Sequence, residues 1–77
     1  MIMKNNSQDW LLRVANLEVG DQIIAHIGDE EVTGTVTGFG MHKMHPVIDL
    51  ICEDNKLFPN RFVYISQIVA IMEYYQN

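Results

Sequence analysis

The sequence has little cysteine, few basic residues and no long apolar run. Its one cysteine, Cys52, excludes an internal disulfide, and no Cys/His group has the spacing of a structural zinc site. Five Lys and Arg against ten Asp and Glu give a formal net charge of −5, which disfavours non-specific binding to duplex DNA and anionic membranes. No segment is long and apolar enough to span a membrane, and residues 1–4 do not form a signal peptide. We therefore expect a cytoplasmic protein with no membrane partner.

The chain is long enough for one small domain, residues 1–77. A domain of this size buries a modest fraction of its surface and often needs an additional source of stability. Since disulfides and zinc are excluded, self-association is the remaining source of additional stability. The composition agrees, because 48% of the residues are hydrophobic and only 19% are charged, and a partner would cover part of that apolar surface.

Residues 7–17 predict a helix, whereas residues 1–6 show no pattern and are expected to fray. Ser7 is a suitable N-cap, and Asp9 places a negative charge in the first turn, where the helix dipole favours it. One apolar stripe at i, i+4 and i+7 runs along this helix and consists of Trp10, Val14 and Leu17. A helix this short is not stable alone, so we expect it to cap one end of a barrel, with Trp10 as its anchor.

From residue 21 to residue 72 the apolar pattern changes to a period of two, which is typical of strands. The expected strands are 21–27, 32–38, 44–52, 61–65 and 68–72, and residues 28–30 form a turn. Gly34 and Gly38 lie on the buried face of the second strand, where glycine permits the sharp bend that a small barrel requires. The predicted fold is mainly β: an N-terminal α-helix followed by a small, five-stranded, strongly bent SH3-like barrel.

The stretch from Val32 to Asp54 resembles the first motif of the Sm and Sm-like (Lsm) family. The matching residues are Gly34, Gly38, Phe39, His42, Met44, Val47, Ile48, Glu53 and Asp54. Residues 62–71 resemble the second motif, and Val63-Tyr64 with Ile68 look like its form in the bacterial RNA chaperone Hfq. The resemblance covers roughly residues 19–72 and implies an Sm-like barrel.

The resemblance also implies a homo-oligomeric ring, since Sm-like proteins pair the fourth strand of one protomer with the fifth strand of the next. The expected interface residues are Arg61, Phe62, Val63, Ile65, Ile68, Val69 and Ile71. Strands 61–65 and 68–72 are apolar and would otherwise expose unpaired edges, and head-to-tail pairing of two different edges can close a ring. The alternative is a monomer in which the tail or the helix covers the edge.

In the family, the first loop and the second motif's turn hold single-stranded RNA by base stacking and base-edge hydrogen bonds. The corresponding loop here spans residues 39–45. The implied RNA-binding residues are His42, Lys43, His45, Tyr64 and Ser66. His42 matches the stacking position and His45 replaces the family's Asn, whereas Gly40 and Tyr64-Ile65 stand where the family has Asp and Arg-Gly. The alternatives to RNA binding are that the two histidines are solvated loop residues and that Tyr64 only pairs across strands.

Other functions have weaker support in the sequence. His42 and His45 with Met41, Met44 or Cys52 make an incomplete ligand set, so we expect no metal and no cofactor. No carboxylate pair, nucleophile–base spacing or phosphate-binding glycine loop is visible, which argues against an enzyme. The second hypothesis is an oligomeric scaffold or protein-interaction module of Sm-like fold without RNA binding, favoured by the net charge and the lost Asp, Asn and Arg. The acids at 29–31 are expected to form a solvated hairpin tip.

Overall fold

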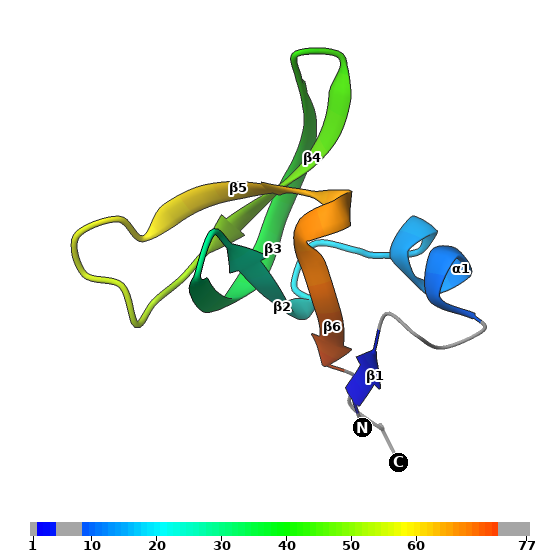
Figure 1. Cartoon of the computed structure of the whole chain (residues 1–77), viewed down its shortest axis with the longest axis horizontal. Helices are drawn as coiled ribbons and strands as arrows, with labels where there is room; N and C mark the ends of the chain where they lie inside the picture. Colours follow the sequence, from blue (N-terminus) through cyan, green and yellow to red (C-terminus); the bar gives the residue numbers. More distant parts are fainter. Residues whose placement is uncertain (1, 5–8, 73–77) are drawn as a thin grey trace.

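The computed structural model describes residues 2–4 and 9–72, which form a mainly β fold with one short α-helix (Figure 1). Its elements in chain order are β1 (Ile2–Lys4), α1 (Trp10–Ala15), β2 (Gln22–Ile27), β3 (Glu30–His42), β4 (His45–Ile51), β5 (Asn60–Tyr64), the 3-10 turn η1 (Ile65–Gln67) and β6 (Ile68–Met72). The prediction of a mainly β fold, with one short helix before the strands that begin near residue 21, is confirmed.

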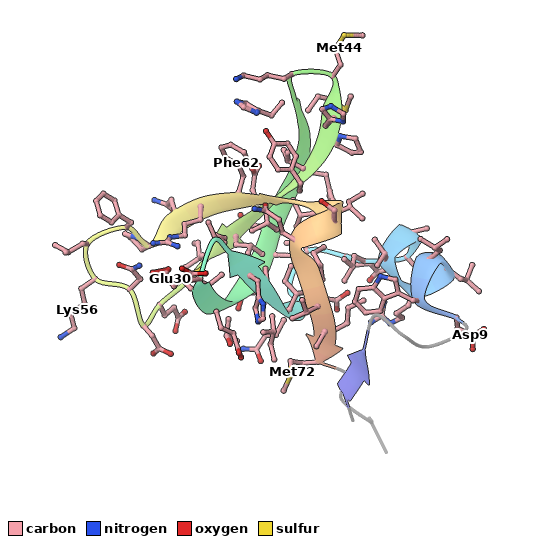
Figure 2. All side chains as sticks on the ribbon, viewed as in Figure 1. Asp9, Glu30, Met44, Lys56, Phe62 and Met72 are labelled. Carbon is pink, nitrogen blue, oxygen red and sulfur yellow. The ribbon has the colours of Figure 1, made fainter. Side chains whose placement is uncertain are left out.

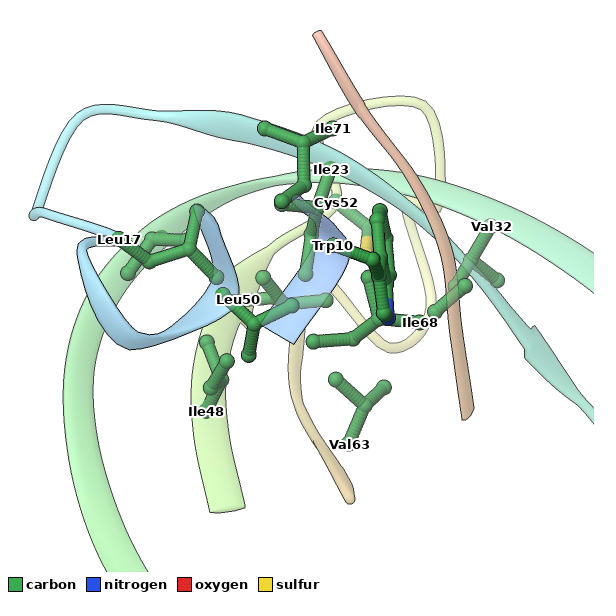
Figure 3. Close-up of a cluster of buried hydrophobic side chains, with 13 residues drawn as sticks. Trp10, Leu17, Ile23, Val32, Ile48, Leu50, Cys52, Val63, Ile68 and Ile71 are labelled. Atoms are coloured by element: carbon green, nitrogen blue, oxygen red, sulfur yellow. The ribbon is translucent and has the colours of Figure 1, made fainter. Parts of the chain in front are cut away.

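All the strands pair antiparallel in one sheet, in the order β1-β6-β2-β3-β4-β5. The sheet is open, because β1 and β5 each have one neighbouring strand among the residues described. The long strand β3 curves around the core, as the green ribbon in Figure 3 shows, and its register with β4 shifts between Val36 and Gly38. Such a bulge increases bend and twist, which lets one strand pair with β2 at its start and with β4 at its end.

The strand β1 is an addition that the sequence did not predict. Residues 1–6 were expected to fray, but Ile2–Lys4 pair with Ala70–Met72 on the outer edge of β6. Three residues are too few to show a strand period, and the pairing depends on an edge that exists only once the sheet has formed. The expectation of fraying is therefore wrong for Ile2–Lys4.

The core lies between the concave side of the sheet and α1 (Figure 3). Its largest fully buried side chains are Ile23, Val36, Leu50, Val63, Ile68 and Ile71. Gly34 faces this core, and a Cβ at that position would lie 3.0 Å from Cys52 Sγ and 3.1 Å from Leu50 Cβ. Gly34 therefore lies on the buried face as predicted, and any side chain there would separate β3 from β4. The same prediction is wrong for Gly38, where a Cβ would face the exposed Asp49, because the register shifts between Val36 and Gly38.

The helix is shorter than the predicted range 7–17. Asp9 precedes α1 and is not part of its first turn; its carbonyl accepts the Arg13 N–H at 2.9 Å, and Ser7 lies outside the described residues. Leu17 follows the helix yet is buried with Trp10, so the predicted apolar stripe docks as expected. At six residues α1 is far too short to cross a bilayer, and the described ranges hold no other helix that could do so.

Candidate nucleic-acid interface

The segment predicted as a loop at residues 39–45 is mostly strand. β3 continues to His42 and β4 begins at His45, and these two residues face each other across the ladder. Only Lys43 and Met44 remain as a two-residue turn, with φ of 50° and 68°. Both values are typical of the tight turns that close hairpins, although Gly or Asn usually occupies them. The loop prediction is therefore wrong, and the hairpin projects from the body of the sheet (Figure 1).

Met44 lies at the tip of this hairpin (Figure 2). It was expected to begin the strand 44–52, yet it lies in the turn and its side chain is 90% exposed. In a tight turn with positive φ both central side chains point away from the sheet, which explains the difference.

Four aromatic side chains meet below the hairpin and form what we call the ring cluster: His42, His45, Phe62 and Tyr64. The centroid of the His42 ring lies 4.9 Å from that of Phe62 and 5.9 Å from that of Tyr64. Tyr64 meets the ring of His45 edge-on at 6.2 Å and that of Phe62 edge-on at 6.0 Å. These are ordinary separations for interacting aromatic pairs, so the four rings stabilise one another.

The strand register places this cluster on the side of the sheet away from the core. Tyr64 pairs with Val47 and Phe62 with Asp49, whereas the intervening Val63 pairs with Ile48. Val63 and Ile48 are buried in the core, and successive side chains of a strand point to opposite faces. Phe62 and Tyr64 therefore lie side by side on the outer face of β5.

One hydrogen bond fixes the centre of the cluster. His42 Nδ1 and Tyr64 Oη are 2.6 Å apart in a half-buried position; which group donates depends on the histidine tautomer. The Tyr64 backbone N–H also donates to Gln67 Oε1 at 2.8 Å, which ties the end of β5 to η1. The first contact orients the Tyr64 ring, and the second fixes its backbone.

An open hollow of about 470 Å³ adjoins the cluster. It is lined by His45, Pro46, Tyr64, Ile65 and Ser66. Three of the five predicted RNA-binding residues, His45, Tyr64 and Ser66, thus share one site, with His42 bonded to its Tyr64 wall. Lys43 sits at the hairpin turn above them. A hollow of this volume is within the usual range for small-molecule sites and is large enough for a nucleobase.

The predicted interface residues differ widely in how deeply they are buried. Val63, Ile68 and Ile71 are buried in the core, while Ile65 packs partly against it and lines the hollow, and Val69 is half-buried. Phe62 belongs to the ring cluster. Arg61 forms an ion pair of 2.6 Å with Glu30, which links β5 to the start of β3; the Glu30 side chain is 52% exposed, in agreement with a solvated hairpin residue. Any interface here would therefore be made by strand backbones and by the few exposed side chains.

Of the residues weighed as metal ligands, Cys52 lies apart from His42 and His45. Burial raises the pKa of the Cys52 thiol; the nearby Arg61 lowers it and Glu30 raises it further. Cys52 packs in the core next to Gly34, whereas His42 is bonded to Tyr64 on the other face. Within residues 2–4 and 9–72, no group of three or more His, Cys, Asp or Glu side chains could hold a metal ion.

Comparisons of the chain with protein-family models, with curated proteins and with solved structures gave no match. The Sm-like assignment stays a prediction from the sequence motifs.

Proposed function

We propose that this chain is a non-enzymatic, ring-forming Sm-like protein of the cytoplasm that binds single-stranded RNA at the ring cluster and the adjoining hollow. The observation that carries the proposal is the meeting of His45, Tyr64 and Ser66 around one hollow, with His42 bonded to Tyr64. The sequence resemblance assigns the same four residues to RNA binding, and it does so without reference to the strand register.

Binding would use stacking and positioned hydrogen bonds. The Tyr64 ring is held by His42 and forms the apolar wall on which one base stacks, with the exposed His45 on its other side. The Ser66 hydroxyl donates to or accepts from the base edge, and Lys43 contacts a backbone phosphate. Lys43 is the one basic side chain assigned to this site, so the affinity of a single protomer for RNA is modest. A ring that repeats the site would raise the affinity by multivalency.

The ring would form by pairing β5 of one copy with β6 of the next. β5 has a free outer edge among the described strands, which favours such pairing. The outer edge of β6 is paired with β1 along Ala70–Met72, so β1 must leave that edge, or shift along it, when the ring closes. Three residues of strand pairing form a small contact, and a neighbouring β5 of five residues would replace it with a longer one.

The proposal predicts a weaker complex for His42→Ala. The change removes the ring that packs on Phe62 and the hydrogen bond that orients Tyr64, so we expect affinity for a short oligouridine to fall about tenfold. Fluorescence anisotropy with labelled RNA measures this directly. His26→Ala is the matched control, because His26 is an exposed histidine on β2 whose contact is with Glu31, and it should bind like the unmodified chain. Equal affinities for the two variants would refute the role of His42.

The second candidate is a scaffold of the same architecture that binds another protein. The observation in its favour is a group of exposed apolar side chains on and after α1, namely Leu11, Leu12 and Val19. None of the three packs on the core. Such an exposed apolar group suits a protein partner, and the net charge of −5 is likewise unfavourable for RNA. An oligomer that binds no RNA at low salt would favour this function.

A further inference from the structure

A second hollow, of about 370 Å³, lies on the other side of Phe62 from Tyr64, towards the start of β5. It is lined by Thr37, Asp49, Leu50, Asn60, Arg61 and Phe62. Phe62 is 44% exposed, so part of its ring is free to contact a ligand. Asp49, Thr37 and Asn60 are not among the residues that match the sequence motifs, and none of them belongs to the proposed RNA site.

The Asp49 side chain points into solvent from β4, between β3 and β5. It pairs with Phe62 on β5 and with Gly38 on β3, so its carboxylate and the Phe62 ring stand on the same outer face. A Cβ at Gly38 would lie 3.4 Å from Asp49 Oδ2, so glycine at this position leaves the carboxylate uncovered. Among the described residues no hydrogen bond or ion pair engages Asp49, which is exposed. Its oxygens are available to accept hydrogen bonds from a ligand.

We propose that this hollow is a second base subsite that selects guanine in single-stranded RNA. A carboxylate accepts two adjacent hydrogen bonds, and guanine presents N1–H and the N2 amino group side by side. Uracil offers one N–H between two carbonyl oxygens, which the carboxylate would repel, and adenine and cytosine each offer one amino group. Phe62 supplies the stacking face. The exposed Thr37 hydroxyl and Asn60 amide can donate to guanine O6.

This inference rests on the proposed function, because one RNA strand would occupy both hollows. The ring cluster connects them: Phe62 lies 6.0 Å from Tyr64 and 4.9 Å from His42 between ring centroids. A base stacked on Tyr64 would therefore have its neighbour in the strand close to Phe62. The Asp49 carboxylate repels phosphate, and Arg61, the one cation lining the hollow, is already paired with Glu30. The second hollow therefore recognises a base edge and not the RNA backbone.

The test compares a short oligouridine with a series in which one uridine is replaced by guanine at successive positions. For the unmodified chain, fluorescence anisotropy should show the best-placed guanine RNA binding about tenfold tighter than oligouridine. Asp49→Asn should abolish this gain, because the amide nitrogen faces the guanine donors with a donor of its own. Glu31→Gln is the charge-matched control on an exposed carboxylate outside this hollow, and it should keep the gain.

The outcomes separate the subsite from the proposed function. If oligouridine binds but no guanine position improves affinity, the guanine subsite is refuted and the RNA site stands. The same conclusion follows if Asp49→Asn keeps the gain in affinity while its urea unfolding curve matches that of the unmodified chain. If neither RNA binds the unmodified chain, the proposed function fails and the subsite fails with it. If both Asp49→Asn and Glu31→Gln lose the tighter binding of the guanine RNA, that tighter binding depends on overall charge, and the subsite is also refuted.

Discussion

Tyr64→Ala should lower the affinity for a short oligouridine by about 10- to 100-fold, since stacking of one base contributes about 1–3 kcal/mol and the variant also loses its partners. The change removes the wall of the hollow, the hydrogen bond to His42 and the edge contacts with His45 and Phe62. The loss should exceed that of His42→Ala, because His42 acts through Tyr64. Anisotropy titrations at constant salt measure both variants on the same scale.

Tyr64→Phe is the matched control for this prediction. It keeps the ring and removes only the hydroxyl that lies 2.6 Å from His42 Nδ1, so we expect a loss of a few-fold. If Tyr64→Ala binds as tightly as the unmodified chain while its circular dichroism spectrum is unchanged, the ring cluster does not bind the base.

Leu50→Ala should destabilise the domain by about 2–5 kcal/mol, which is the usual cost of truncating a buried leucine. Leu50 is 1% exposed and lies at the centre of the core next to the position that Gly34 leaves free. At about 0.05–0.15 kcal/mol per residue, a 77-residue chain has a total stability of about 4–12 kcal/mol, so this one change removes a large share. Urea unfolding followed by tryptophan fluorescence reports on the same core through Trp10.

Leu57→Ala provides the control, because Leu57 is 83% exposed in the segment between β4 and β5. The same chemical change there should alter the free energy of unfolding by no more than about 0.5 kcal/mol. Similar unfolding midpoints for the two variants would show that Leu50 does not pack as the core of this fold requires.

The order of helix and strands could be predicted because each element carries its own periodic pattern. Trp10, Val14 and Leu17 repeat at helical spacing, and Ile23 and Ala25 alternate with polar or half-buried residues, so the faces they bury follow from the residues alone. The need for glycine at position 34 also follows from its place on a buried face, where β3 meets Cys52 and Leu50.

Two features of the fold could not be predicted from the sequence: one forms only against the folded sheet, and the other uses residue types that are unusual in a tight turn. β1 has three residues and forms only against the finished edge of β6. The hairpin turn consists of Lys43 and Met44, and neither residue type signals positive φ, so the sequence favoured a longer loop over residues 39–45.

The candidate site could be predicted in part. The motif resemblance identified His42, His45, Tyr64 and Ser66, which the strands bring to one place. Phe62 was assigned to an interface, although its alternation with Tyr64 already placed the two rings on one face of β5. Asp49 was missed because its position beside Phe62 follows from the register between β4 and β5, and a single sequence does not reveal register.

Native mass spectrometry, without and then with a short uridine-rich RNA, tests the central claim most directly. The account predicts one oligomer at a fixed multiple of the 8.9 kDa chain that gains the mass of one RNA. A parallel sample that lacks Ile2–Lys4 should assemble at least as readily, because β1 then no longer occupies the β6 edge. A monomer in both samples, with no RNA adduct in either, would contradict both the ring and the RNA site.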